Sequence, residues 1–250
     1  MTLANVERLV RIMERLRDPK TGCEWDTVQT FESIAPYTIE EAYEVADAIQ
    51  RADMADLKDE LGDLLLQVIF HSRIAEESGL FDLSDVAATI SDKMERRHPH
   101  IFLGAAEGGH YLWEQIKSAE RGAKGAKGAL DGVAIALPAL LRAEKLQKRA
   151  ARTGFDWPDP SGARAKIDEE LAEVEAAESD AEREEEFGDL IFAVVNWARK
   201  HGVDPEAALR AGNAKFERRF KAMEAEAGET FLSLDLDAKE ALWLAAKSRE

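Results

Sequence analysis

The chain has 250 residues with 33 basic and 50 acidic side chains, and its formal net charge of −17 excludes a general binder of nucleic-acid backbones, which needs clustered positive charge. Its single cysteine, Cys23, excludes an intramolecular disulfide and favours a reducing compartment. Residues 1–7 lack the basic and apolar parts of a signal peptide, and no apolar run approaches the roughly 20 residues of a membrane span. We therefore expect a cytoplasmic protein.

Apolar residues recur at helical spacing along most of the chain, which is rich in Ala, Glu, Leu, Lys and Arg. The connection over residues 51–56 is short, as between antiparallel neighbours. These patterns predict an all-α protein with helices over residues 6–16, 36–51, 57–77, 163–178 and 184–200.

Several blocks of sequence occur twice in the same order. Residues 21–25 match residues 153–157, and residues 93–97 match residues 215–219. Between the copies lies a small, basic segment with repeated glycines, which is typical of a flexible linker. We predict two tandem helical-bundle modules, with an N-terminal module at 1–120, a linker at 121–135 and a C-terminal module at 136–250.

The most informative repeat is acidic. The first copy reads Glu40-Glu41-x-x-Glu44 and then Glu60-x-Gly62-Asp63, and the second reads Glu169-Glu170-x-x-Glu173 and then Glu186-x-Gly188-Asp189. Residues three apart share a helix face, so two antiparallel helices bring four carboxylates together. Such a group is costly without a cation, and oxygen ligands alone favour magnesium or manganese. The glycine in each copy indicates that something approaches the backbone there.

Basic and aromatic residues complete the candidate site. Lys215, Arg218 and Arg219 can contact phosphate oxygens, and Trp243 can stack on a nucleobase, whereas Trp157 is expected to be a packing anchor. Lys166 precedes Glu170 by four residues, where the first copy has Tyr37. The second copy therefore has the fuller set of polar residues.

The assembled pattern resembles the MazG family of bacterial nucleoside triphosphate pyrophosphohydrolases over nearly the whole length. The resemblance rests on both acidic motifs and on the segments at residues 29–33, 95–100, 147–151 and 215–219. It implies an all-α fold whose bundles are completed by homodimerisation. It also implies magnesium-dependent hydrolysis of nucleoside triphosphates to monophosphate and pyrophosphate.

The resemblance further implies that the C-terminal copy is the active one. Its metal ligands are then Glu170, Glu173, Glu186 and Asp189. The resemblance does not identify the general base, and our own hypothesis for that role is Glu169. The expected nucleotide contacts are Lys166, Lys215, Arg218, Arg219 and Trp243. The equivalent first-module carboxylates are Glu41, Glu44, Glu60 and Asp63.

Two other functions remain open from the sequence. One is a helical regulatory module that binds a nucleotide or a protein partner without turnover. The other is a phosphohydrolase for a different pyrophosphate compound, such as a nucleotide sugar. Pyrophosphate release from a panel of substrates separates them.

Overall fold

The computed structural model describes residues 3–102, 104, 113, 116, 120 and 128–250, and within them every regular element is helical. The prediction of an all-α fold is therefore confirmed. The chain divides into two compact units, Met1–Ser118 and Ala119–Glu250. Residues 121–127 of the predicted linker lie outside the described residues. None of the described helices combines the length and the apolar character that a membrane span needs.

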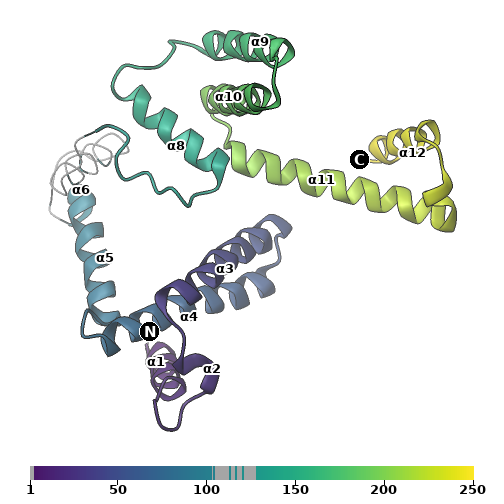
Figure 1. Ribbon diagram of the computed structural model, residues 1–250. Helices are drawn as coiled ribbons and strands as arrows, with labels where there is room; N and C mark the ends of the chain where they lie inside the picture. The colour runs from purple at the N-terminus through teal and green to yellow at the C-terminus, as the bar shows by residue number, and fades with distance from the viewer. Residues whose placement is uncertain (1–2, 103, 105–112, 114–115, 117–119, 121–127) are drawn as a thin grey trace. The chain divides into compact units, whose positions relative to one another are not determined.

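The first unit is built around a helical hairpin, in which α3 and α4 lie side by side (Figure 1). The two helices are joined by Ala52, in the left-handed conformation at φ 56°, and by Asp53, which caps α4. The elements of this unit are α1 (Ala4–Leu16), α2 (Glu24–Thr27), α3 (Phe31–Arg51), α4 (Met54–Glu77), α5 (Leu83–Arg97) and α6 (Pro99–Phe102).

The predicted start of the helix over residues 36–51 is wrong, because the corresponding helix α3 begins at Phe31. The Thr30 hydroxyl accepts a hydrogen bond from the Ser33 amide at 3.3 Å, and the Ser33 hydroxyl accepts one from the Thr30 amide at 2.8 Å. This reciprocal cap satisfies two amides and starts the helix ahead of the proline. Pro36 therefore lies inside the helix.

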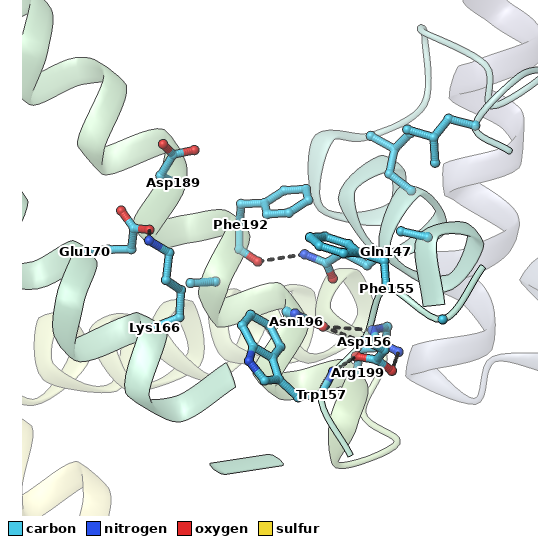
Figure 2. A pocket seen from close by; sticks show the side chains of 15 residues that line it. Gln147, Phe155, Asp156, Trp157, Lys166, Glu170, Asp189, Phe192, Asn196 and Arg199 are labelled. Atoms are coloured by element: carbon cyan, nitrogen blue, oxygen red, sulfur yellow. Dashed lines mark hydrogen bonds and ion pairs between the residues drawn. The ribbon is translucent and has the colours of Figure 1, made fainter. Parts of the chain in front are cut away.

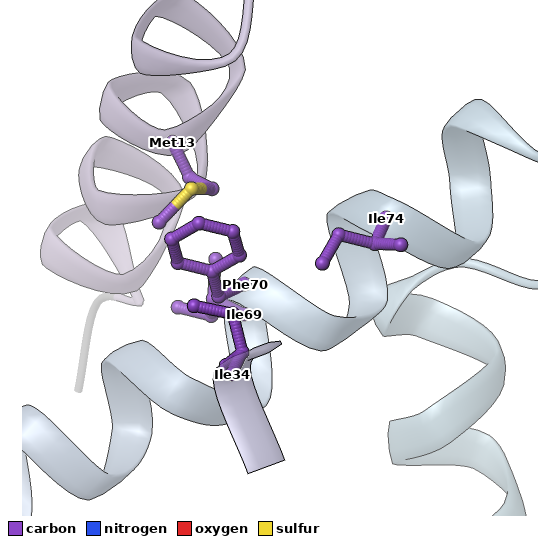
Figure 3. Packing of buried hydrophobic residues seen from close by; sticks show 5 residues of the cluster. All are labelled: Met13, Ile34, Ile69, Phe70 and Ile74. Atoms are coloured by element: carbon purple, nitrogen blue, oxygen red, sulfur yellow. The ribbon is translucent and has the colours of Figure 1, made fainter. Parts of the chain in front are cut away.

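Buried apolar side chains from α1, α3 and α4 form the core of the first unit. Figure 3 shows Met13 against Phe70, with Ile34 and Ile69 beside them. Gly22 allows the chain to turn tightly after α1, since a Cβ at this position would lie 2.3 Å from the Leu16 carbonyl oxygen. The turn brings α2 back beside the core.

Arg17 connects three elements next to this core and is only 7% exposed. Its guanidinium forms an ion pair with Glu77 at 2.7 Å, at the end of α4. It also donates to the backbone carbonyls of Asp26 at 2.6 Å and Gln29 at 3.2 Å. One charged group thus satisfies the ends of α2 and α4 together.

The second unit contains a similar hairpin, α9 and α10, with α8 packed against α10 (Figure 1). The helix α11 follows α10, and α12 packs against α11 with Met223, Phe231 and Ala246 buried between them and the short turn η1. The bounds are α8 (Ala139–Ala151), α9 (Pro160–Ala176), α10 (Asp180–Lys200), α11 (Pro205–Ala227), η1 (Gly228–Ser233) and α12 (Leu236–Ser248).

The two helix-interior glycines do not mark a close contact inside the described chain. A Cβ added at Gly62 or at Gly188 would meet no atom within 4 Å. The expectation of a close approach is therefore not met by any described residue of the same chain.

We predict that Arg17→Ala destabilises the first unit by about 1–3 kcal/mol, because it removes the guanidinium donor of the Gln29 carbonyl and leaves the partly buried Glu77 carboxylate to Arg73. Amide hydrogen exchange in α1 and at the end of α4 measures the loss. Arg73→Ala is the matched control, since Arg73 contacts the same carboxylate at 2.9 Å from the helix surface and is expected to cost less than about 1 kcal/mol. Equal effects of the two substitutions would contradict this role of Arg17.

Candidate active site

The carboxylates of the second unit are positioned by the start and the inner face of α9. Asp159 caps this helix by accepting a hydrogen bond from the Ser161 amide at 2.8 Å, with Pro160 at the first helical position. Ala163, Ile167 and Glu170 then follow at intervals of four and three, and all three are buried. Glu170, at 3% exposure, thus places a carboxylate on the stripe that packs against α10.

Three of the predicted ligands come together at this packing surface. Carboxylate oxygens of Glu170, Glu186 and Asp189 lie within 4.8 Å of one another. The Oε2 atom of Glu170 is buried and has no hydrogen-bond partner. A buried oxygen without a partner and a donor set made only of oxygens fit a hard divalent cation such as magnesium.

Glu173, the fourth predicted ligand, is exposed at the edge of this group. Loss of surrounding water raises the pKa of its carboxyl, and the charge of Glu170 raises this pKa further. The pKa of Glu186 is raised by the same loss of water and then by Glu173, Glu170 and Asp189. The four carboxylates therefore repel one another, and a bound cation would relieve that repulsion.

Lys166 is the positive charge beside the cluster. Its ammonium pairs with Glu170 at 2.7 Å and with Glu169 at 2.9 Å, and these two carboxylates raise the pKa of the lysine. Glu169 is exposed and lies outside the group of three. Its role as general base stays a prediction.

The first unit has a similar group of three carboxylates, but it lacks a lysine at the position equivalent to Lys166. Oxygens of Glu41, Glu60 and Asp63, at the positions equivalent to the second group, also lie within 4.8 Å of one another. Burial, followed by the charge of Asp63, raises the pKa of Glu41. Tyr37 stands where the second unit has Lys166, so this cluster has no ammonium at that position.

The predicted phosphate contacts lie on other helices. Arg218 and Arg219 of α11 both pair with Glu250, at 2.6 and 2.7 Å, and the Arg219 guanidinium lies 5.4 Å from the Trp243 ring. Lys215 is exposed on α11. These four residues, from α11 and α12, do not line the pocket beside the carboxylates, whereas Lys166, the fifth predicted nucleotide contact, does.

The pocket beside the carboxylates was not predicted from the sequence. It has a volume of about 800 Å³, and Lys166, Glu170 and Asp189 line it together with residues of α8, α10 and the turn before α9 (Figure 2). The polar and aromatic residues to which reasoning from the sequence gave no part in the site are Gln147, Phe155, Asp156, Phe192, Asn196 and Arg199. One signal was present, since Gln147 belongs to a segment that carried the family resemblance.

Comparisons with known proteins identify the family of the chain. The family model of the MazG nucleotide pyrophosphohydrolase domain matches residues 29–102, which include the first carboxylate cluster. The chain is 49% identical to the nucleoside triphosphate pyrophosphohydrolase of Escherichia coli strain K12, over 98% of each chain. It is also 49% identical to the nucleoside triphosphate pyrophosphohydrolase/pyrophosphatase MazG of Thermotoga maritima, over 87% of this chain and 85% of that protein. The chain therefore belongs to the MazG family.

Proposed function

We propose that the protein is a nucleoside triphosphate pyrophosphohydrolase, which converts a nucleoside triphosphate and water to the monophosphate and pyrophosphate. The observation that carries the proposal is the cluster of Glu170, Glu186 and Asp189 at one side of a large, mostly apolar pocket. A nucleotide needs both features, because its phosphates require cations and its base requires apolar walls. The names of the relatives from Escherichia coli and Thermotoga maritima support the same activity.

The four acidic residues of the motif are the proposed magnesium ligands, with manganese as a substitute. Glu170, Glu186 and Asp189 would hold the ion, and Glu173 would complete the set from the edge. A cation bound there supplies positive charge to the phosphate oxygens of the substrate and polarises the attacked phosphorus. The raised pKa values of Glu173 and Glu186 support this assignment.

The residues around the proposed cation site would stabilise the leaving pyrophosphate, activate the attacking water and bind the substrate. Lys166, already paired with two carboxylates, can exchange one of them for a phosphate oxygen and neutralise the negative charge that develops on pyrophosphate. Glu169 would orient the attacking water and take its proton when the phosphorus–oxygen bond to the leaving pyrophosphate breaks. Lys215, Arg218 and Arg219 are proposed to bind phosphate, and Trp243 to contact the nucleotide.

We also propose that the active protein is a homodimer. Phe187, Ile191 and Val194 of α10 occur at intervals of four and three, and they are 48%, 52% and 45% exposed. An apolar stripe of this kind on a helix is normally covered. The open space at Gly188, beside Phe187, permits close approach of a second helix. A second copy could also supply the basic residues of α11, which do not line the pocket of their own chain.

We predict that the double substitution Glu186→Gln with Asp189→Asn lowers pyrophosphate release by more than about 100-fold, because it removes two of the proposed ligands. Phosphate detection after added inorganic pyrophosphatase measures the rate for each nucleoside triphosphate with magnesium. The matched control is Glu60→Gln with Asp63→Asn, which changes the equivalent first-unit residues and is expected to retain most activity. Full loss in the control with none in the second-unit variant would contradict the assignment. If the wild-type protein released no pyrophosphate from any nucleotide, the result would favour a regulatory module that binds without turnover.

We predict that Lys166→Met lowers kcat/KM for nucleoside triphosphates by roughly 100-fold, because it removes one charge-stabilising contact to the phosphates. Lys166→Tyr, which installs the residue of the first unit, is expected to have the same effect. Arg164→Met is the control, since Arg164 lies on the same helix and pairs with Asp168 instead. An unchanged kcat/KM in both Lys166 variants would exclude a role for this side chain in the reaction.

We predict that Ile191→Glu converts the dimer to a monomer, because it places a charge in the middle of the apolar stripe on α10. Light scattering coupled to size-exclusion chromatography measures the mass of each species. Lys58→Glu makes a larger change in charge at a side chain that is 84% exposed and is expected to leave the dimer intact. A wild-type protein with the mass of one chain at micromolar concentration would rule out the homodimer.

A further inference from the structure

The pocket in the second unit has two chemically different sides. Figure 2 places Lys166, Glu170 and Asp189 together on one side, and Gln147, Phe155, Trp157, Asn196 and Arg199 on the other. Phe192 lies between the two groups in this view. A nucleotide whose phosphates occupy the charged side would extend its sugar and base toward the aromatic side.

The amide of Gln147 is held in one orientation by the backbone. Its Nε2 donates to the carbonyl oxygen of Phe192 at 2.8 Å, and a carbonyl can only accept. The other atom of the amide, Oε1, is therefore fixed as an acceptor. This oxygen is buried and has no hydrogen-bond partner, and the whole residue is only 6% exposed. A buried acceptor without a donor is unfavourable, and a ligand N–H group would satisfy it.

The neighbouring polar groups are already fixed by one another. Arg199 donates to the Asn196 Oδ1 at 2.6 Å and pairs with Asp156 at 2.7 Å. Lys200 adds a second ion pair to Asp156 at 3.3 Å. Because the Oδ1 of Asn196 accepts from Arg199, its amide nitrogen is the atom left to donate to a ligand. The pocket therefore offers one oriented acceptor, from Gln147, and one oriented donor.

The aromatic side chains around these groups are at least partly exposed, and one of them is held in place by packing. Trp157 packs against the first turn of α9, where a Cβ at Gly162 would lie 2.1 Å from its ring. Phe155 is 84% exposed, Phe192 is 41% exposed and Trp157 is 40% exposed. Exposed rings at a pocket wall suit stacking against a planar heterocycle.

From this geometry we infer that the pocket binds the nucleobase, and that the Gln147 Oε1 accepts a hydrogen bond from an N–H group of the base. The inference rests on the proposed function and adds to it a residue that determines specificity. It also assigns the base to the walls formed by Phe155, Trp157 and Phe192 rather than to Trp243. A pocket of about 800 Å³ has room for a nucleoside.

The test compares ligands that differ only in the base. The dissociation constants of the four nucleoside 5′-monophosphates and of ribose 5-phosphate are measured on the full chain with magnesium, by calorimetry and by tryptophan fluorescence. We expect the wild-type protein to bind at least one nucleotide more than about 30-fold more tightly than ribose 5-phosphate. Gln147→Leu is expected to reduce this ratio at least tenfold, while leaving the affinity for ribose 5-phosphate within about twofold.

Two further variants serve as a surface control and as an independent test of the pocket. Gln50→Leu makes the same chemical change on the exposed surface of α3 and is expected to leave the ratio unchanged. Ala150→Phe fills the pocket from α8 without removing a side-chain hydrogen bond, and it should abolish the preference for a base. Circular dichroism verifies the fold, and Ala150→Phe alone decides if Gln147→Leu does not fold.

The outcomes separate this inference from the proposed function. An unchanged ratio in a folded Gln147→Leu or Ala150→Phe protein would overturn the inference, as would a wild-type protein that binds no nucleotide better than ribose 5-phosphate. Neither result affects pyrophosphate release, which tests the proposed function by itself. Conversely, the protein could show a base preference that depends on Gln147 and yet hydrolyse no nucleotide. That result would support the nucleobase pocket and contradict the proposed enzymatic function.

Discussion

Mutual repulsion of carboxylates on the packed side of a helical hairpin is the constraint on which the site depends. Glu170 is buried where an apolar residue would stabilise the contact between α9 and α10, and Glu186 and Asp189 approach it from the other helix. Burial of like charges is unfavourable unless a counter-charge is present. The hairpin therefore gives up some folding free energy to keep these carboxylates together at the proposed cation site, and α8 and the turn before α9 line the pocket beside them.

Local sequence patterns were sufficient to predict the helices that carry the carboxylates, and three of the four expected carboxylates lie together in each unit. Helical spacing placed Glu170 with Glu186 and Asp189 on facing surfaces, because a short connection leaves two helices few other ways to pack. The pattern misplaced the start of α3, since the proline was taken as the first residue. The hydrogen bonds between Thr30 and Ser33 start the helix earlier. Side-chain capping outweighed the positional preference of proline in this case.

The pocket could not be predicted in the same way. Its walls come from segments distant in the sequence, and Gln147 and Asn196 have no spacing that marks them as neighbours. The decisive property of Gln147 is the orientation of its amide, which the carbonyl of Phe192 sets across the contact between α8 and α10. Similarly, the requirement for glycine at position 162 arises only from the Trp157 ring that packs on it. Such features depend on tertiary contacts, whereas the acidic motif depends on helical periodicity.

The exchange of Lys166 for Tyr37 has a thermodynamic consequence for ligand-linked stability. In the second unit the ammonium already offsets part of the negative charge of Glu170, so the folded hairpin carries its own counter-ion. Among the described residues of the first unit, Tyr37 takes the place of this lysine, and burial and the neighbouring carboxylates raise the pKa of Glu41. A divalent cation stabilises a folded state in proportion to how much more tightly that state binds it than the unfolded chain does. For a divalent cation that binds both clusters, this linkage would make the melting temperatures of the two hairpins differ in how strongly they depend on the cation concentration.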